Sequence, residues 1–342
     1  MKLDTVEDIL EEVKEISGFK GRNLRSWLYQ AILLNALKCK RDKLDILDLK
    51  VVNRVVDEFR YAAKVFKPYR SVRKVSIFGS ARVLEGEPHY ELAAQFSRIL
   101  AEQGFMVITG ASQGIMKAGI EGAGTENSFG VNILLPFENP ASVMQGDPKL
   151  VTFRYFFTRK LFFVMEADAF ALFPGGFGTQ DEGFEVLTLL QTGKAPPMPI
   201  VLMELPGDDY WETWDRFVRK QLLGRGYISQ EDLSFYKIAH SPKEAAAWIK
   251  SYYSTYHSVR QVRDTLVIRL ERELSDGRLK QLNESFADIV ETGKIVKTAP
   301  LPQERDEPIL LSKPRICFRN NQQSAGRLHE MILAINDMRR EA

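Results

Sequence analysis

The sequence predicts an α/β protein whose core is a doubly wound parallel sheet, and three observations lead to this fold class. Between residues 73 and 256, short apolar runs alternate with segments of helical periodicity, as in parallel strands joined by crossover helices. Several of these runs end in glycine or small polar residues. One run, residues 169–173, leads directly into the turn Pro174-Gly175-Gly176 and then into a helical apolar face. Ligands bind at the carboxyl ends of the strands in such sheets, so we expect the functional site there.

The elements of the core follow from this alternation. The expected strands are residues 75–78, 106–109, 129–135, 152–156, 169–173 and 199–203. The expected helices are residues 90–103, 114–122, 159–166, 178–192, 210–223 and 242–256. A last strand is considered just before His240. A lone histidine is more often structural than functional, so His240 is not counted among the site residues.

Two regions outside the core complete the expected organisation. Residues 1–72 read as a helical N-terminal extension, residues 73–256 as the α/β core, and residues 257–342 as a small α/β C-terminal module. The helical segments of the extension are expected at residues 6–16, 24–37 and 51–66. The module is expected to run in the order β-α-β-β-α, with strands at 265–270, 293–298 and 315–319 and helices at 279–290 and 325–338.

Composition and charge limit the classes of partner. At 342 residues the chain is long enough for two or three domains. Its formal net charge of +2 favours neither a nucleic acid nor a membrane surface as partner. No apolar run reaches about 18 residues, so no membrane span is expected. Cys39 and Cys317 lie far apart, and the acidic amphipathic N-terminus does not resemble a signal peptide, so we expect a cytoplasmic protein.

The segment from residue 174 to residue 185 carries the strongest chemical signal. A glycine turn at the start of a helix offers free backbone N–H groups and the positive end of the helix dipole, which suit a phosphate. Asp181, Glu182 and Glu185 in the first turns are unusual there, because carboxylates repel a bound phosphate. The alternative interpretation is an ordinary helix start with acidic residues, since glycine motifs alone match by chance.

Residues 174–182, PGGFGTQDE, resemble the PGGxGTxxE signature of the "Lonely guy" (LOG) family, whose members are often labelled lysine decarboxylases. The resemblance implies a Rossmann-like nucleotide-binding fold and phosphoribohydrolase activity on a nucleoside 5′-monophosphate. Some members release cytokinins from their riboside monophosphates, and others act on purine monophosphates such as AMP. Because the family generally forms dimers, a homodimer or larger homo-oligomer is implied. The resemblance covers neither residues 1–72 nor residues 257–342.

Two other strand ends carry glycine turns. The first strand ends in Gly79 and Ser80, whose backbone N–H groups and hydroxyl can contact a ligand. Residues 109–118, TGASQGIMKA, resemble the TGGGPGIMEA segment of the family with departures: residues 111–113 replace two glycines and a proline, and Lys117 replaces an acidic residue. Gly110 and Gly114 remain, so the backbone turn is expected to survive, while the lysine could alter substrate preference.

A basic pair follows the fourth strand. Arg159 and Lys160 match an Arg-Lys pair of the family, whose arginine is implied to be catalytic or substrate-orienting. The alternative interpretation is a solvated helix start. Cations at a helix N-terminus oppose the dipole, which favours a compensating anion such as a ligand phosphate or Glu182.

The resemblance implies the chemistry that we expect of these residues, which is hydrolysis of the N-glycosidic bond to a free base and ribose 5-phosphate. The phosphate is expected on the backbone of residues 175–179, with a contact from the Thr179 hydroxyl. Glu182 would stabilise the oxocarbenium-like ribose and activate water, and Arg159 would orient it. The expected phosphate- and substrate-binding residues are Gly79, Ser80, Gly110, Gly114, Lys160, Gly175, Gly176, Gly178 and Thr179. No cofactor is expected and no metal, since no ligand cluster is visible by spacing.

Two alternatives remain open at this point. A decarboxylase would need a lysine that forms a Schiff base with pyridoxal phosphate, and Lys160 is the lysine placed near the site by motif. A non-hydrolytic sensor or carrier could keep the same nucleotide or cofactor pocket, which the altered segment at 110–117 and the two flanking regions would favour. In either case the flanking regions could bind an effector or mediate oligomerisation.

Overall fold

The computed structural model of the chain describes residues 11, 24–134, 142–322 and 324–337. It forms two compact units, residues 1–61 and residues 62–342. The first unit contains helix α2 (Leu24–Arg41) and most of α3 (Ile46–Phe66). The helix expected at residues 6–16 lies outside the described residues. The expected division at residues 72 and 256 stays a prediction.

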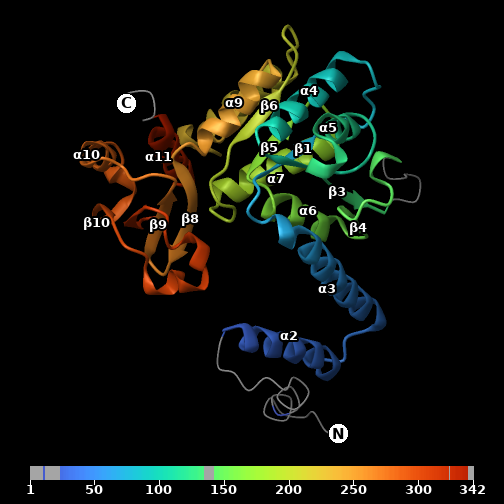
Figure 1. Cartoon of the computed structure of the whole chain (residues 1–342), viewed down its shortest axis with the longest axis horizontal. Coiled ribbons are helices and arrows are strands. Elements are labelled where there is room, and N and C mark those ends of the chain that lie inside the picture. Colours follow the sequence, from blue (N-terminus) through green and yellow to red (C-terminus); the bar gives the residue numbers. More distant parts are fainter. Residues whose placement is uncertain (1–10, 12–23, 135–141, 323, 338–342) are drawn as a thin grey trace. The chain divides into compact units, whose positions relative to one another are not determined.

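The centre of the second unit is a seven-stranded parallel sheet in the order β4-β3-β2-β1-β5-β6-β7 (Figure 1). Its strands are β1 (Lys74–Phe78), β2 (Met106–Thr109), β3 (Ser128–Ile133), β4 (Leu150–Phe153), β5 (Ala169–Leu172), β6 (Ile200–Met203) and β7 (Tyr236–Ala239). The chain proceeds outward from β1 to β4 and then returns to β5 on the other side of β1. The order therefore reverses between β1 and β5, which is where ligands bind in such sheets.

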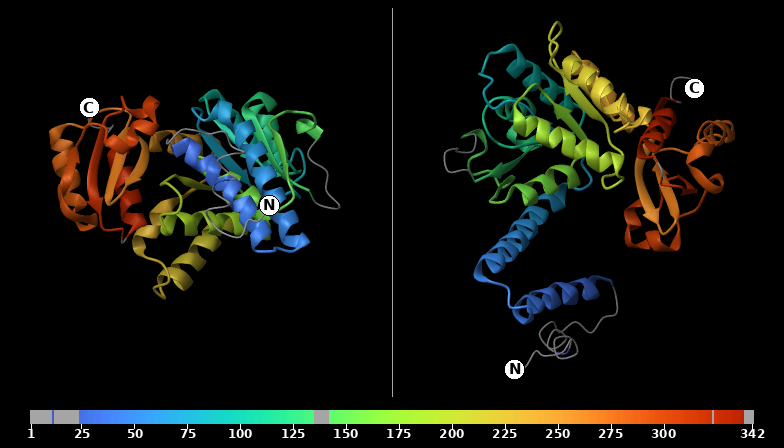
Figure 2. Two further views of the ribbon diagram at one scale, coloured as in Figure 1. Left: turned by 90° about the horizontal axis from the view of Figure 1, so that it is seen from below. Right: turned by 180° about the vertical axis from the view of Figure 1, so that it is seen from behind.

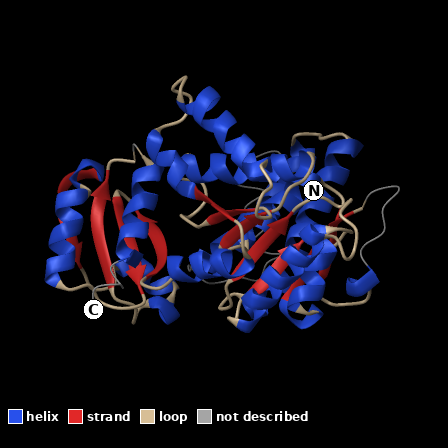
Figure 3. Cartoon of the chain, turned by 90° about the horizontal axis from the view of Figure 1, so that it is seen from above, coloured by secondary structure: helices blue, strands red, loops and turns tan. Residues whose placement is uncertain are grey.

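Helices cover both faces of this sheet, with helices blue and strands red in Figure 3. These are α4 (Pro88–Glu102), α5 (Ile115–Ala123), α6 (Phe156–Met165), α7 (Phe177–Gln191), α8 (Tyr210–Phe217) and α9 (Pro242–Tyr252). Side chains of α4, α5 and α9 pack in one apolar cluster, and those of α6, α7 and α8 pack in another. The helices therefore bury both faces of the sheet, as is usual for parallel sheets. The α/β class and the doubly wound parallel core are confirmed.

The C-terminal region forms a second sheet, which is antiparallel and has the order β10-β11-β9-β8 (Figure 2). Its elements are β8 (Tyr256–Val262), β9 (Thr265–Leu270), α10 (Asp276–Ser285), β10 (Val290–Lys297), β11 (Arg315–Asn320) and α11 (Ala325–Asp337). The expected order β-α-β-β-α lacked β8. That strand is polar and mostly half-buried, so it has no apolar run to reveal it.

Several expected boundaries are wrong. The strand expected at 152–156 ends at Phe153, and Phe156 already begins α6, because Tyr155 takes the extended N-cap conformation of that helix. The helix expected at 242–256 ends at Tyr252, since Tyr256 begins β8. The helix expected at 279–290 likewise ends at Ser285 and is followed by β10. No helix in the described part of the chain combines the length and apolar character that crossing a membrane requires.

Candidate functional site

A pocket of about 740 Å³ opens at the carboxyl ends of β1 and β5, where the strand order reverses. This volume lies within the range of small-molecule sites. Most of the residues predicted for the site line it: Gly79, Ser80, Arg159, Gly175, Gly176, Gly178, Thr179 and Glu182. Gly110, Gly114 and Lys160 are not among its lining residues, and their positions are described below.

The turn between β5 and α7 requires glycine at one position. A Cβ atom on Gly175 would lie 2.2 Å from Thr179 Oγ1 and 2.9 Å from the backbone nitrogen of Ser80, which is too close for any side chain. Gly176 and Gly178 have open space around them. The Gly175 carbonyl accepts a hydrogen bond from the Tyr210 hydroxyl at 2.5 Å, which fixes the turn against α8.

The pocket floor is the N-terminus of α7. The helix begins at Phe177, after Gly176 as its N-cap, so its first backbone N–H groups have no intrahelical acceptor. The Thr179 N–H is the exception, because it donates to the Gly176 carbonyl at 3.1 Å. The side chain of Thr179 is nearly buried and lines the pocket. Free N–H groups and the positive end of the dipole make this floor suitable for an anion.

Glu182 is the buried carboxylate of this pocket. It lies in the second turn of α7 with 8% of its surface exposed. Burial raises the pKa of Glu182 to about 7, although Lys160 and Arg159 pull it down. Glu185 and Asp181 add to the upward shift. Near neutral pH this carboxyl group can therefore both accept and release a proton, as a general acid or base must.

Arg159 approaches the same pocket from α6. Its guanidinium carbon lies 5.2 Å from the ring centre of Phe163 and 5.8 Å from that of Phe156. A Cβ atom on Gly110 would lie 3.0 Å from Arg159 Nη2 and 2.7 Å from the sulfur of Met116. Gly110 therefore leaves space for the arginine at the end of β2, and its contact with substrate stays a prediction.

Gly114 supports the neighbouring turn. Its φ is +65°, and a Cβ atom there would lie 2.2 Å from the Ser80 carbonyl oxygen. The N–H of Ile115 donates to that carbonyl at 3.1 Å, so the second glycine segment packs directly on the Gly79-Ser80 turn. Lys117, the charge departure from the family segment, pairs with Glu85 at 2.9 Å and Glu121 at 3.4 Å, and it does not line the pocket.

Lys160 follows Arg159 on α6 and does not line the pocket. Its ammonium group pairs with Asp181 at 2.7 Å and Glu185 at 2.6 Å on α7. Burial alone would lower the pKa of Lys160, but these two carboxylates outweigh it and the pKa lies above its ordinary value. Lys160 thus joins α6 to α7 and supplies positive potential to Glu182.

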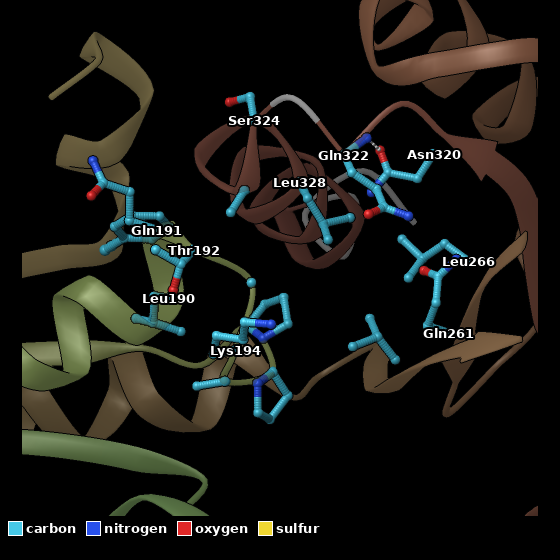
Figure 4. Close-up of a pocket in the computed structure, with 17 residues that line it drawn as sticks. Leu190, Gln191, Thr192, Lys194, Gln261, Leu266, Asn320, Gln322, Ser324 and Leu328 are labelled. Carbon is cyan, nitrogen blue, oxygen red and sulfur yellow. Dashed lines mark hydrogen bonds between the residues drawn. The ribbon is translucent and has the colours of Figure 1, made fainter. Parts of the chain in front are cut away.

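A second pocket, of about 500 Å³, lies between the loop after α7 and the C-terminal sheet (Figure 4). Its polar groups are mainly side-chain amides and hydroxyls, and its walls include leucines of both regions. The labelled lining residues are Leu190, Gln191, Thr192, Lys194, Gln261, Leu266, Asn320, Gln322, Ser324 and Leu328. None of the predicted site residues lines this second pocket.

Sequence reasoning missed one further cluster. Glu204, Glu212 and His240 each place a potential ligand atom within 4.8 Å of the other two. The sequence alone presents His240 as a lone histidine. Glu204 directly follows β6 and His240 directly follows β7, so the rule that parallel strands end at one edge could have brought these two together.

Residues 108–249 match a family model described as "Possible lysine decarboxylase". The resemblance drawn from residues 174–182 to the LOG-type family is thereby confirmed over this segment. Among curated proteins, no relative matches the chain.

Solved structures of low identity resemble part of the chain. A molybdenum cofactor binding protein from Rippkaea orientalis is 19% identical, and the match covers 53% of this chain and 95% of that chain, with a TM-score of 0.38. A molybdenum cofactor carrier protein from Chlamydomonas reinhardtii is 16% identical, with 52% and 96% covered and a TM-score of 0.38. DNA processing protein A from Helicobacter pylori is 13% identical, with 52% and 80% covered and a TM-score of 0.37.

Proposed function

We propose that the chain hydrolyses the N-glycosidic bond of a nucleoside 5′-monophosphate, of the AMP or cytokinin riboside monophosphate type, to a free base and ribose 5-phosphate. One observation carries this proposal. The pocket at the switch in strand order joins an anion-binding helix N-terminus to a buried carboxylate, Glu182, whose pKa lies near 7. The LOG-type family match over residues 108–249 supports it.

The phosphate and the ribose would occupy different parts of the pocket. The 5′-phosphate would bind the free N–H groups at the start of α7, next to the Thr179 hydroxyl, where Gly175 leaves the backbone uncovered. The Gly79-Ser80 turn packs against the Pro174-Gly175 turn, because the Ser80 N–H donates to the Pro174 carbonyl at 3.1 Å, and it would contact the ribose. This arrangement would leave the scissile bond facing Glu182.

Glu182 would act on the reacting water. The ionised carboxylate takes a proton from water, the water oxygen bonds to C1′, and the bond from C1′ to the base nitrogen breaks with its electron pair on the base. The base then gains a proton, which Glu182 can return. The negative charge also stabilises the oxocarbenium character of the transition state. Arg159 keeps part of the Glu182 population ionised by lowering its pKa.

The decarboxylase alternative fits the described residues poorly. A Schiff base forms from a neutral amine, which is favoured where the lysine pKa is lowered. Lys160 instead pairs with two carboxylates, and its pKa is raised. We therefore do not propose that Lys160 holds pyridoxal phosphate.

Free-base release from AMP, GMP, CMP and N6-isopentenyl-AMP, followed by chromatography, tests the proposal. Glu182→Gln should lower the rate by about 10²–10⁴-fold, because it removes the general base. Glu185→Gln removes the same charge one turn along α7 and serves as the matched control, with a loss of less than about tenfold expected. If the wild type binds these nucleotides tightly and releases no base from any of them, the hydrolase proposal is wrong and a non-hydrolytic sensor or carrier function takes its place.

We further propose that the chain forms a homodimer next to this pocket. Exposed apolar side chains gather on α6 and at the start of α7: Phe156, Phe157, Leu161, Met165 and Phe177, of which Phe177 is 97% exposed. Sedimentation velocity should give a dimer for the wild type and a monomer for Phe157→Glu/Leu161→Glu. A monomeric wild type at micromolar concentration would contradict this proposal and leave the hydrolase proposal standing.

A further inference from the structure

We propose that Glu204, Glu212 and His240 bind a divalent transition-metal ion of the Zn²⁺ class. The three residues come from different elements at one edge of the sheet. Glu204 follows β6, Glu212 lies in the first turn of α8, and His240 follows β7. The proposal does not depend on the hydrolase activity, because none of the three lines the strand-end pocket.

The geometry is close to that of a metal site. One carboxylate oxygen from each glutamate and one ring nitrogen of His240 all lie within 4.8 Å of one another. Ligands about 2.0–2.2 Å from a zinc ion are themselves separated by up to about 4 Å, so small side-chain movements would complete the site. Glu212 is exposed and can make such a movement, while Glu204 is held in place.

A second and independent observation concerns unsatisfied polar atoms. Glu204 is fully buried, and its Oε2 accepts the backbone N–H of Trp211 at 2.7 Å. Its Oε1 has no hydrogen-bond partner, and neither does the buried Nδ1 of His240. Buried polar atoms without partners are costly and need an explanation. A cation between them would satisfy both atoms at once.

The surrounding charges favour a cation. Besides Glu204 itself, the carboxylates of Glu212 and Asp208 lie near enough to act on it electrostatically, so negative charge gathers at this edge. Lys237 faces this edge from β7 but is paired with Glu244 at 3.0 Å. The Glu244 carboxylate also accepts the backbone N–H of His240 at 3.3 Å.

The donor set selects the class of ion. Two carboxylates and one imidazole are hard and borderline ligands, which suit Zn²⁺ and Mn²⁺ better than Cu⁺, and two negative charges would balance the ion. The bound ion would fix the first turn of α8, because Glu204 already accepts the N–H of Trp211 there. The three protein ligands would leave the fourth position of a tetrahedral ion to water.

Zinc binding by the tag-free full chain tests this inference. The protein is first freed of metal with a chelator and then titrated with ZnCl₂ in competition with a chromophoric chelator. The wild type should bind about one equivalent, and His240→Gln and Glu212→Gln should each weaken binding at least about tenfold. Glu244→Gln removes a carboxylate beside His240 without removing a ligand, so its affinity should stay close to that of the wild type.

Thermal unfolding gives a second readout that separates lost binding from lost folding. Zn²⁺ should raise the unfolding midpoint of the wild type and of Glu244→Gln, because a ligand of the native state stabilises it, and should raise that of Glu212→Gln less at the same zinc concentration. Glu212 is exposed, so this variant keeps the fold even if Glu204→Gln does not. Absence of zinc uptake by the wild type, or equal uptake by all variants, would overturn the proposal.

Discussion

The ends of β5 and β6 offer two buried carboxylates in contrasting surroundings. Glu182 and Glu204 are both nearly or fully buried, and burial raises the pKa of each. Near Glu182 the charges are mixed, because Lys160 and Arg159 oppose Asp181 and Glu185. Near Glu204, a hydrogen bond from the Trp211 N–H and the charge of His240 lower its pKa, and the carboxylates of Glu212 and Asp208 raise it.

This difference shows how one sheet edge can serve ligands of opposite charge. At the end of β5, cations and a helix N-terminus lie beside the carboxylate, so an anionic ligand can be held next to it. At the end of β6, a second carboxylate and an imidazole nitrogen converge on the first, which attracts a cation.

After the loss of Glu182 itself, the largest effect is expected from Arg159→Gln, which removes one of the two cations near Glu182. Loss of the cation should lower the rate of base release by about 10²–10³-fold, as for other charge-stabilising donors. It should also shift the rise of the residual rate to higher pH, because Arg159 lowers the pKa of Glu182. The measurement is the initial rate of base release from AMP across neutral pH.

Arg82→Gln is the matched control for this prediction. Arg82 lines the same pocket but is exposed at its rim. Its loss should change the rate much less and leave the pH profile in place. An unshifted pH profile in Arg159→Gln would show that Arg159 does not lower the pKa of Glu182. The charges near Glu182 would then not differ from those near Glu204 in the way described here.

The stability of the protein should depend on pH through Glu182. Its folded-state pKa of about 7 lies above the unfolded value of 4.5, so the folded state binds the proton more tightly. Stability is therefore greatest below pH 4.5 as far as this group is concerned, and falls as the pH rises to about 7. At about 1.4 kcal/mol per pKa unit, the loss by pH 8 approaches about 3 kcal/mol.

Chemical denaturation of Glu182→Gln at two pH values measures this effect. The variant should be more stable than the wild type at pH 8 and similar to it near pH 4.5, because glutamine carries no charge to bury. Glu204→Gln should act in the same direction in metal-free protein, and Zn²⁺ should reverse its advantage, since the wild type then gains a ligand. If the unfolding free energies of Glu182→Gln and the wild type differ by the same amount at both pH values, the pKa of Glu182 is not raised in the folded state.

Gly175→Ala tests whether space or conformation requires the glycine. The added methyl group would meet Thr179 Oγ1 at 2.2 Å and the Ser80 nitrogen at 2.9 Å. We expect the free energy of unfolding to fall by about 1–3 kcal/mol and AMP binding to weaken. Gly178→Ala meets no atom within 4 Å and should be tolerated in both measurements. Equal losses in the two variants would point to a general effect on α7.

Much of the fold and part of the site could be predicted from the sequence. Apolar runs located β2 and β5 well, because buried parallel strands are apolar on both faces. Glu182 and Arg159 lie 23 positions apart, yet the strand-end rule placed them at one edge, and both line the pocket. The polar strand β8 was not predicted, because a half-buried edge strand has no continuous apolar run.

The remaining features depend on contacts that no local pattern records. The pairing of Lys160 with Asp181 and Glu185 requires the packing of α6 against α7. The space that Gly110 leaves for Arg159 requires the side-chain position of a residue 49 places away. His240 looked solitary because its neighbour Glu204 follows a different strand. Such pairs become visible only when the strand order is known.

The smallest expected effect links the two strand ends through α8. Tyr210 donates its hydroxyl to the Gly175 carbonyl and accepts from Gln180 Nε2 at 2.7 Å, and the next residue, Trp211, donates its N–H to Glu204. Tyr210→Phe should lower the unfolding free energy by about 1 kcal/mol and weaken AMP binding a few-fold, because the carbonyl loses its donor.

Tyr236→Phe is the matched control, since its hydroxyl donates to Asp215 at 2.6 Å, away from the glycine turn. It should cost similar stability, measured by denaturation, and leave AMP affinity unchanged. Zinc affinity should be retained in both variants, because neither removes one of the three ligands. Equal loss of AMP affinity in the two would show that α8 does not hold the Gly175 turn. A loss of zinc affinity in Tyr210→Phe alone would show instead that the hydrogen bond between Tyr210 and Gly175 also positions the zinc ligands on and beside α8.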